Sequence, residues 1–238
     1  MDKTRSAICH PSRGSAKAGT FNRLLITLAA SALFISFSAP VSPAADPLTP
    51  EQLVRKAAEN NDNLQSYQAR MVVHLTKGKQ TEDSQYLFSF QKPHLKRMYV
   101  EKGKEKKSTV ILRKDGVIRG KPGGMLSVVP PLTLKPEDKR LQDLWERRFY
   151  EADWGTLLKE IQDSLKDCSS GHVETVNGGK EFLLTIEAKN GDIDQAWFDH
   201  ERLFLVKRNI RLANGDQLDA KWIDVALNPR FPDKHFDF

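Results

Sequence analysis

The stretch Asp199-His200-Glu201 places a histidine between two carboxylates, a set of residue types that can carry out acid–base chemistry. A general base must be held within hydrogen-bond reach of the group that it deprotonates. These residues lie between two alternating segments, where a tight turn is expected, and neighbouring side chains on such a turn diverge. We therefore predict a surface turn here and not an active site.

Cys168 is a second candidate for chemistry, because His172 follows it four residues later. A basic partner that lowers the pKa of a thiol makes it a nucleophile, but we favour the interpretation that Cys168 is a small residue after the end of a helix. The sequence contains no H-E-x-x-H, no G-x-S-x-G, no P-loop and no paired C-x-x-C. We expect no catalytic residue, no metal ligand and no cofactor, and predict that the protein is not an enzyme.

Residues 1–44 have the pattern of a cleaved secretory signal peptide. Arg23 precedes the apolar run "LLITLAASALFISF", and the small residues "SPA" follow it. The run has about 14 residues, whereas roughly 20 are needed to cross a bilayer, so a transmembrane anchor is the less favoured alternative. We expect one exported, soluble domain, residues 45–238, located in the periplasm.

The net charge of the chain argues against nucleic acid as a partner. Without residues 1–44, which hold five basic groups and one acidic group, the formal charge of +6 becomes 32 minus 30, or +2. Nucleic-acid-binding domains normally show a basic excess over the whole domain. Cys168 remains as a single cysteine, so no internal disulfide is expected, and a monomer stabilised by an apolar core is predicted.

A basic stretch runs from Lys92 to Gly116 and carries nine lysines and arginines against three acids. Apolar residues alternate within it, at Met98 and Val100, and this pattern is typical of a strand. We predict that the lysines form the solvated face and the turn of a hairpin. A weak contact of the turn "EKGKEKK" with an anionic membrane surface is a further expectation.

The first half of the exported part is predicted to contain a short helix and then strands. Thr49 begins a capping-box sequence, which predicts a helix that ends near Glu59. Apolar residues then recur at every second position, which is typical of strands with one covered face. The predicted strands span residues 67–75, 86–90, 95–101 and 108–114, followed by "VIRG".

The second half is predicted to contain two helices and then a meander of strands. Apolar residues at helical spacing predict one helix over 136–149, and a second helix with Asp153 as its N-cap that extends to about Leu165. From His172 onward, alternating segments separated by three Asn-Gly pairs predict about five strands joined by hairpins.

Three segments carry a family pattern: "LQSYQARMVVHL", "YLFSFQKPHLKRMYVE" and "AWFDHERLFLVKRNIRLANGDQLDAKWIDVALNPRFPDKHFDF". In this order they resemble the outer-membrane lipoprotein carrier (LolA-like) superfamily, and an uncharacterised envelope relative more than an orthodox carrier. The resemblance covers most of residues 49–238. It implies an α+β fold in which helices cover the concave face of a strongly curved antiparallel sheet, a half-open β-barrel of about 10–11 strands. An apolar cavity for acyl chains would lie between sheet and helices.

The candidate cavity wall combines the inner face of the sheet, the apolar loop over 123–134 and the helix after Asp153. Methionine suits such a wall because its unbranched thioether adapts to irregular ligands. The predicted wall residues are Met71, Val73, Phe88, Phe90, Met98, Met125, Leu126, Val129, Trp154 and Leu158. Plain core packing is the alternative for each of them.

The resemblance also implies a lid latch, a contact that ties the sheet to the covering helices, at the position of Lys92. Family members carry arginine there. Lysine lacks the planar fork of donors that arginine offers, so a solvated surface lysine is the alternative interpretation.

The leading hypothesis for function is a periplasmic, non-enzymatic carrier or binder of lipid or lipoprotein acyl chains, held in an apolar cavity under helical lids. The alternative is an envelope protein-interaction or sensor module with a filled core, and the volume of the cavity distinguishes the two. A hydrolase that uses His200 or Cys168 gains no support from residue spacing. The expected partners are lipid or an acylated protein, with an envelope protein as a further candidate.

Overall fold

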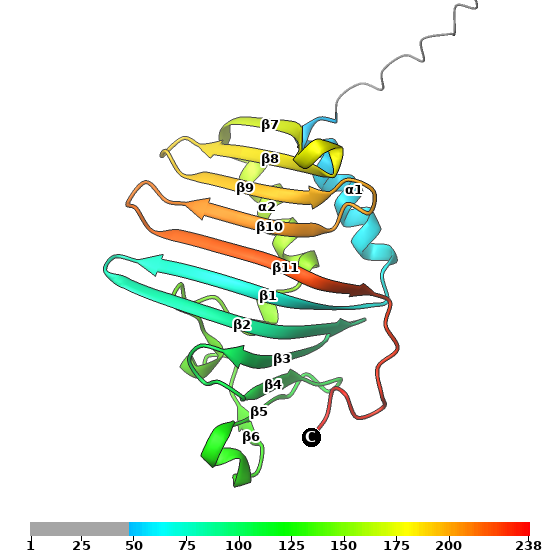
Figure 1. Ribbon diagram of the computed structural model, residues 1–238, viewed down its shortest axis with the longest axis vertical. Helices are drawn as coiled ribbons and strands as arrows, with labels where there is room; N and C mark the ends of the chain where they lie inside the picture. The colour runs from blue at the N-terminus through cyan, green and yellow to red at the C-terminus, as the bar shows by residue number, and fades with distance from the viewer. Residues whose placement is uncertain (1–47) are drawn as a thin grey trace, which may run out of the picture. The chain divides into compact units, whose positions relative to one another are not determined.

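A single antiparallel sheet of eleven strands is the framework of the protein in the computed structural model, which describes residues 48–238 (Figure 1). The signal peptide predicted over residues 1–44 lies outside the described residues. The strands are β1 (Ser66–Lys77), β2 (Gln80–Gln91), β3 (Leu95–Lys102), β4 (Thr109–Leu112), β5 (Ile118–Lys121), β6 (Leu132–Leu134), β7 (Cys168–Val176), β8 (Glu181–Ala188), β9 (Ile193–Asp199), β10 (Leu205–Arg211) and β11 (Gln217–Leu227).

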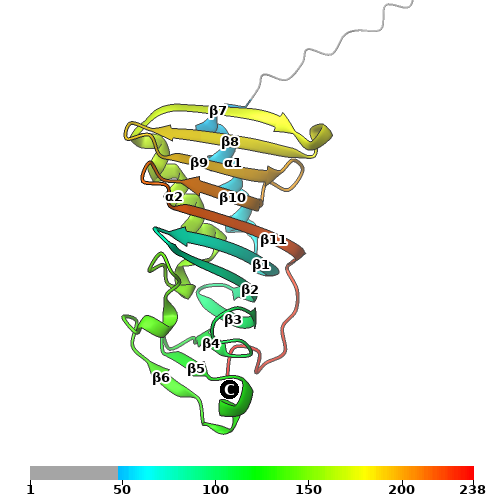
Figure 2. The same cartoon turned by 60° about the vertical axis from the view of Figure 1, so that its left-hand side comes forward.

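The strand order across the sheet is β6-β5-β4-β3-β2-β1-β11-β10-β9-β8-β7. The first strand is therefore central and pairs with both β2 and the last strand, so that Met71 lies opposite Tyr86 on one side and Trp222 on the other. The edge strands β6 and β7 lie at opposite ends of the sheet, which is curved and not closed (Figure 2). This is the half-open, α+β architecture that the sequence predicts.

Two α-helices within residues 48–238 cover the concave face of the sheet: α1 (Pro50–Asn63) and α2 (Trp154–Lys166) (Figure 2). Thr49 caps α1 with the predicted capping box, although the helix ends later than Glu59. Asp153 caps α2 as predicted, by accepting hydrogen bonds from the backbone N–H and the hydroxyl of Thr156. The helices pack on each other and on β7 and β8, so they lie over the C-terminal half of the sheet.

The prediction of a helix over residues 136–149 is wrong. Two short 3₁₀ turns, η2 (Lys139–Leu141) and η3 (Phe149–Glu151), and a bridge between Gln142 and Arg148 occupy this segment. The carboxylate of Asp143 accepts hydrogen bonds from the backbone N–H groups of Trp145 and Arg147, which closes a turn in place of a helical ladder. The indole N–H of Trp145 donates to the carbonyl of Thr76 at 2.8 Å and holds the segment against the end of β1.

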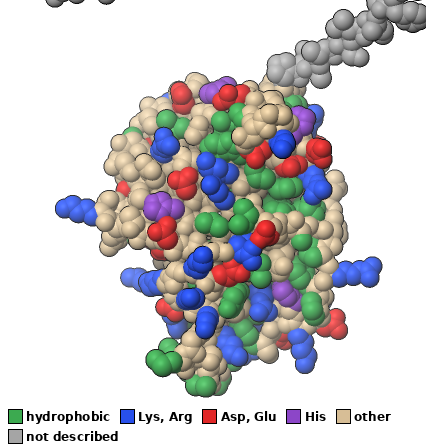
Figure 3. All heavy atoms as spheres, in the orientation of Figure 1, with side chains coloured by type: hydrophobic (Ala, Val, Ile, Leu, Met, Phe, Trp, Pro, Cys, Tyr) green, Lys and Arg blue, Asp and Glu red, His purple; other side chains and the backbone are tan. Residues whose placement is uncertain are grey.

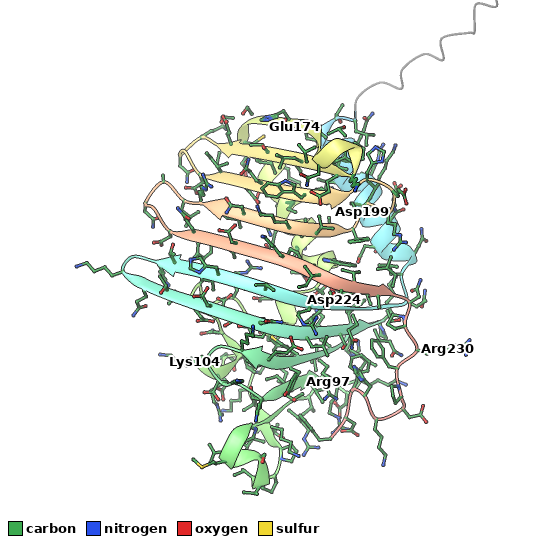
Figure 4. The ribbon with its side chains drawn as sticks, viewed as in Figure 1. Arg97, Lys104, Glu174, Asp199, Asp224 and Arg230 are labelled. Carbon is green, nitrogen blue, oxygen red and sulfur yellow. The ribbon has the colours of Figure 1, made fainter. Side chains whose placement is uncertain are left out.

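The C-terminal tail covers the outer face of the N-terminal half of the sheet (Figure 1). Arg97, which Figure 4 shows on β3 beside this tail, donates to the backbone carbonyl of His235 at 2.8 Å. The imidazole of His235 contacts the hydroxyl of Ser89 at 3.0 Å and stacks on Phe231, with ring centroids 4.3 Å apart. The tail thus buries polar groups on a face that would otherwise be solvated.

The position of His235 predicts a pH dependence of stability. Burial, and then the charge of Arg97, lower the pKa of His235 to about 4. In the unfolded chain a histidine titrates near 6.5, so between these values the unfolded state binds more protons than the folded state. The free energy of unfolding must therefore decrease as the pH falls through this window. We expect His235→Gln to flatten the dependence of Tm on pH between roughly 6.5 and 4.

The matched control is His172→Gln, since His172 is exposed on β7. This variant should keep the pH dependence of the wild-type Tm, measured by circular dichroism. Equal slopes for the wild type and His235→Gln would contradict the assignment.

Candidate functional site

An apolar cavity of about 540 Å³ lies on the inner face of the sheet, over the strands that the helices leave uncovered. The turns of residues 139–149 bound it on the side opposite the sheet, and the N-terminal part of α2 bounds one end. Its apolar wall comprises Met71, Val73, Tyr86, Met98, Val100, Val110, Pro122, Leu126, Val129, Leu132, Leu134, Leu141, Phe149, Ala152, Leu157, Leu218, Ala220 and Trp222. Ligand pockets in proteins commonly have volumes of roughly 300–1,000 Å³, so this one can admit a small molecule or an acyl chain.

The predicted wall residues lie in four different environments: the main cavity, a second cavity, the packed core and the exposed surface. Five of them line the main cavity: Met71, Val73, Met98, Leu126 and Val129. Two line a second cavity of about 240 Å³ between α1, α2 and the turn before β10: Trp154 and Leu158. Phe88 and Phe90 pack in the core against Tyr67, whereas Met125 is 97% exposed and lines neither of these two cavities.

Three cavity-wall residues on β11 were not predicted from the sequence. Leu218, Ala220 and Trp222 occupy alternate positions of that strand and face the cavity. Their period of two was visible in the sequence. Their place beside Met71 was not, because it depends on the pairing of the first strand with the last.

Charged residues around the cavity are mostly basic. Seven cations stand against three acids among the lining residues: Lys104, Lys121, Lys139, Arg140, Arg147, Arg148 and Arg208 against Glu82, Glu105 and Asp143. All of the cations except Arg208 are exposed or half-buried, so they form a rim. Burial raises the pKa of Asp143, which is the one acid of the three that accepts backbone hydrogen bonds from Trp145 and Arg147. The rim is therefore suited to a negatively charged group.

Arg208, on β10, is a buried cation in the cavity wall and is only 3% exposed. Its guanidinium donates to both carboxylate oxygens of Asp194, at 3.1 and 2.8 Å, and to Glu160 of α2 at 2.7 Å. Burial opposes the charged form, but Asp194 and then Glu160 outweigh it, so the pKa of Arg208 is raised. This ion pair network fixes α2 to the sheet at the end of the cavity.

Lys96 corrects the prediction that the lysines of the basic stretch are solvated. It is only 9% exposed, because it lies on the same side of β3 as Met98 and so faces inward. Its ammonium group donates to Asp153 and to the carbonyl of Tyr150, both at 2.5 Å. The lysine that alternates with the wall residues therefore holds the N-cap of α2.

Lys92, the position of the expected latch, contacts the helix layer. Its ammonium group donates to the backbone carbonyl of Asp62 in the last turn of α1. The side chain is half-buried, at the start of the loop that follows β2. A lysine can therefore bridge sheet and helix here with a single donor in place of the arginine fork.

The residues considered for catalysis take part in contacts that stabilise local structure. Asp199 accepts hydrogen bonds from the backbone N–H groups of Glu201 and Arg202 in the predicted turn, and His200 stacks on Phe182. The thiol of Cys168 donates to the carbonyl of Leu165 at 3.1 Å. Over residues 48–238, no group of three or more histidine, cysteine or acidic side chains is placed to hold a metal ion. None of the helices in this range has the length and apolar character required to span a membrane.

Removal of Arg208 should be strongly destabilising. Arg208→Met would leave Asp194, whose side chain is only 12% exposed, without its partner, and an unpaired buried charge costs about 3–5 kcal/mol. We expect the free energy of unfolding in urea to decrease by about this amount, and the double variant with Asp194→Asn to recover part of it.

Arg211→Met on the same strand is the control, because Arg211 is exposed and its loss should change stability by less than about 0.5 kcal/mol. Equal stability of the Arg208 and Arg211 variants would contradict a structural role for the buried network.

Comparisons with known proteins reveal likeness only at the level of structure. No protein-family model and no curated protein matches the sequence. A LolA superfamily protein from Nitrosomonas europaea is 12% identical, with 81% of this chain and 99% of that chain covered and a TM-score of 0.38. A putative outer membrane lipoprotein-sorting protein domain from Vibrio parahaemolyticus is 7% identical over 79% and 97% of the chains, with a TM-score of 0.42. The Mycobacterium tuberculosis lipoprotein LppX is 10% identical over 77% and 97%, with a TM-score of 0.42. The described part of the chain itself has an open eleven-stranded antiparallel sheet with two α-helices on the concave face.

Proposed function

We propose that this protein is a non-enzymatic carrier or binder of amphiphiles in the bacterial periplasm, and that it holds an acyl chain of a lipid or lipoprotein in its main cavity. The observation that supports this function is the apolar cavity of about 540 Å³ on the inner face of the sheet. Export rests on the signal peptide predicted from the sequence.

The energetics of uptake follow from the apolar wall. Each buried methylene contributes about 0.8 kcal/mol, so a chain of about ten methylenes gains roughly 8 kcal/mol before the cost of association. The wall residues include methionines on two strands, Met71 and Met98, which can adapt to chains of different shape. Binding would thus depend on chain length more than on chemical detail.

The rim provides a place for the head of the amphiphile. Six cations and three acids surround the mouth, since Arg208 is buried and paired with Asp194, and this basic excess favours a carboxylate or phosphate there. Two buried donors of wall residues have no partner in the described part of the chain: the indole N–H of Trp222 and Nε of Arg148. Unpartnered buried donors are rare, and an acceptor oxygen of a bound ligand would satisfy either of them.

Lys92 acts in this proposal as a latch that ties the lid helix α1 to the sheet. Its bond to Asp62 is a single charge-assisted contact at a half-buried position, so it stabilises the helix in this place by about 1.5–3 kcal/mol at most. A contact of this strength can break when α1 moves. Movement of α1 would enlarge the second cavity, which α1 and α2 line together.

The alternative, a protein-interaction module with a filled core, agrees less well with this geometry. A filled core leaves few voids larger than a water molecule, whereas the inner face over β2–β6 borders a cavity of about 540 Å³. The cavity therefore favours the binder over the module.

The test fills the cavity with a larger side chain. Val73 lines the cavity, and Val72, its neighbour on β1, points to the opposite face and is 39% exposed. We expect Val73→Trp to weaken binding of a fluorescent fatty acid at least tenfold, because the indole occupies the space of the chain. Val72→Trp should bind like the wild type. Fluorescence titration measures both, and equal affinities of the two variants would contradict the assigned site.

A second measurement examines the native ligand. Protein purified without detergent should release lipid on organic extraction, detected by mass spectrometry, and Val73→Trp should release less. Wild-type protein that carries no lipid and takes up no acyl probe would refute the proposed function.

A further inference from the structure

The most exposed apolar side chains among the described residues lie together at one tip of the molecule. Met125 is 97%, Val128 87% and Leu126 62% exposed, all in the 3₁₀ turn η1 (Gly124–Val128) between β5 and β6. Figures 1 and 2 show this turn at the end of the sheet farthest from β7, and Figure 3 shows hydrophobic side chains projecting there. Clusters of projecting apolar side chains mark interaction sites more often than scattered ones do.

A lysine-rich turn packs directly against this apolar tip. A Cβ added to Gly123 would lie 2.2 Å from the carbonyl carbon of Lys107, so the backbones of the two loops are in contact. The turn, residues 102–107 between β3 and β4, has the sequence KGKEKK, with four lysines against one glutamate. Figure 4 shows Lys104 at the same end of the sheet, and Lys121 precedes the tip on β5. This contact places the lysines of the turn beside the apolar loop.

The lysines of this surface are available to an external partner. Lys104, Lys106, Lys107 and Lys121 are all exposed. Within residues 48–238 none of these four lysines forms a salt bridge, whereas Asp138 is paired with Arg140 and Glu146 with Lys77. Glu105 is the acid inside the turn, and it lies near Arg140.

We propose that the tip (residues 124–128) and the lysine turn (residues 102–107) form a docking surface for an anionic lipid bilayer. The apolar side chains enter the boundary between headgroups and acyl chains, and the ammonium groups contact lipid phosphates. An apolar projection beside clustered lysines is the combination that binds such an interface, because buried apolar area and attraction to anionic lipid add together. An acidic protein partner would match the lysines but would gain little from three projecting apolar side chains that are 62–97% exposed.

The docking surface also adjoins the mouth of the cavity. Leu126 of the tip, Lys104 of the turn and Lys121 all line it. An amphiphile that leaves the bilayer at this surface would enter the cavity without its acyl chain crossing water. Docking goes beyond the proposed function and does not require it, because most side chains of the surface, among them Met125, Val128 and Lys106, line neither cavity.

The experiment measures co-sedimentation of the purified protein with vesicles of phosphatidylcholine and phosphatidylglycerol in equal parts, and with vesicles of phosphatidylcholine alone. The wild type should bind the anionic vesicles and lose binding as salt is raised. Each lysine near an anionic surface contributes roughly a fivefold factor, so K104Q/K106Q/K107Q should weaken binding by about 100-fold. M125S/L126S/V128S should weaken it at least tenfold, by removing the inserted side chains.

The matched control for the tip is V72S/I223S, which removes apolar side chains that are 39% and 43% exposed on the outer face of β1 and β11. This variant should bind vesicles like the wild type. A wild type that does not bind anionic vesicles at low salt, or a tip variant that binds as well as the control, would overturn the proposal. The proposal would also be overturned if the wild type dimerised without binding vesicles and M125S/L126S/V128S were a monomer.

Val73→Trp separates this inference from the proposed function. It should lose the fatty acid probe and keep vesicle binding, since Val73 lies inside the cavity. Vesicle binding by a wild type that takes up no probe would support docking while refuting the carrier function. Probe uptake by a wild type that binds no vesicles would support the carrier function while refuting docking.

Discussion

The attachment of the N-terminus of α2 to the inner face of the sheet is the contact on which the rest of the structure depends. Tyr67, fully buried on β1, stacks on Trp154 at 4.1 Å between ring centroids and accepts a hydrogen bond from its backbone N–H. Asp153 caps the same helix and binds Lys96 of β3. Strands β1 and β3 therefore position one helix end through aromatic packing and a buried ion pair. Such a pair is costly to break, because either partner alone would be an unpaired buried charge.

This anchoring determines where the cavity lies. From its fixed start near β1 and β3, α2 extends over β7 and β8, where α1 joins it. Beyond the N-terminal end of α2, which binds Lys96 of β3, no α-helix within residues 48–238 covers the inner face of β2–β6, and the turns of residues 139–149 lie across it. Turns cannot fill the volume that a helix with its side chains would occupy, so apolar wall residues remain partly unpacked. The cavity thus arises from the uneven distribution of helices over one continuous sheet.

Features that depend on residues close together in the chain could be predicted from the sequence. Thr49 and Asp153 cap their helices as predicted, and the alternation after Tyr67 separates the two faces of β1. The prediction of a helix over 136–149 failed because Leu141, Leu144 and Trp145 have helical spacing, whereas the carboxylate of Asp143 accepts backbone hydrogen bonds that a helix would use. The prediction for Lys96 failed for a related reason. Its charge suggested solvent, although its parity with Met98 placed it inside.

By itself the sequence determined the caps at Thr49 and Asp153, the strand alternation, the Asn-Gly turns and hence an antiparallel sheet with one covered face, since each follows from interactions within a few residues. Its half-open form was what the family resemblance implied. Tertiary structure alone decided which strands meet, and so which residues share a wall: Met71 faces Trp222 only because the first strand pairs with the last. It also decided that Lys107 contacts Gly123 and that Arg208 is buried beside Asp194. These contacts join residues far apart in the chain, and their energy depends on burial and on partner geometry, which local patterns do not encode.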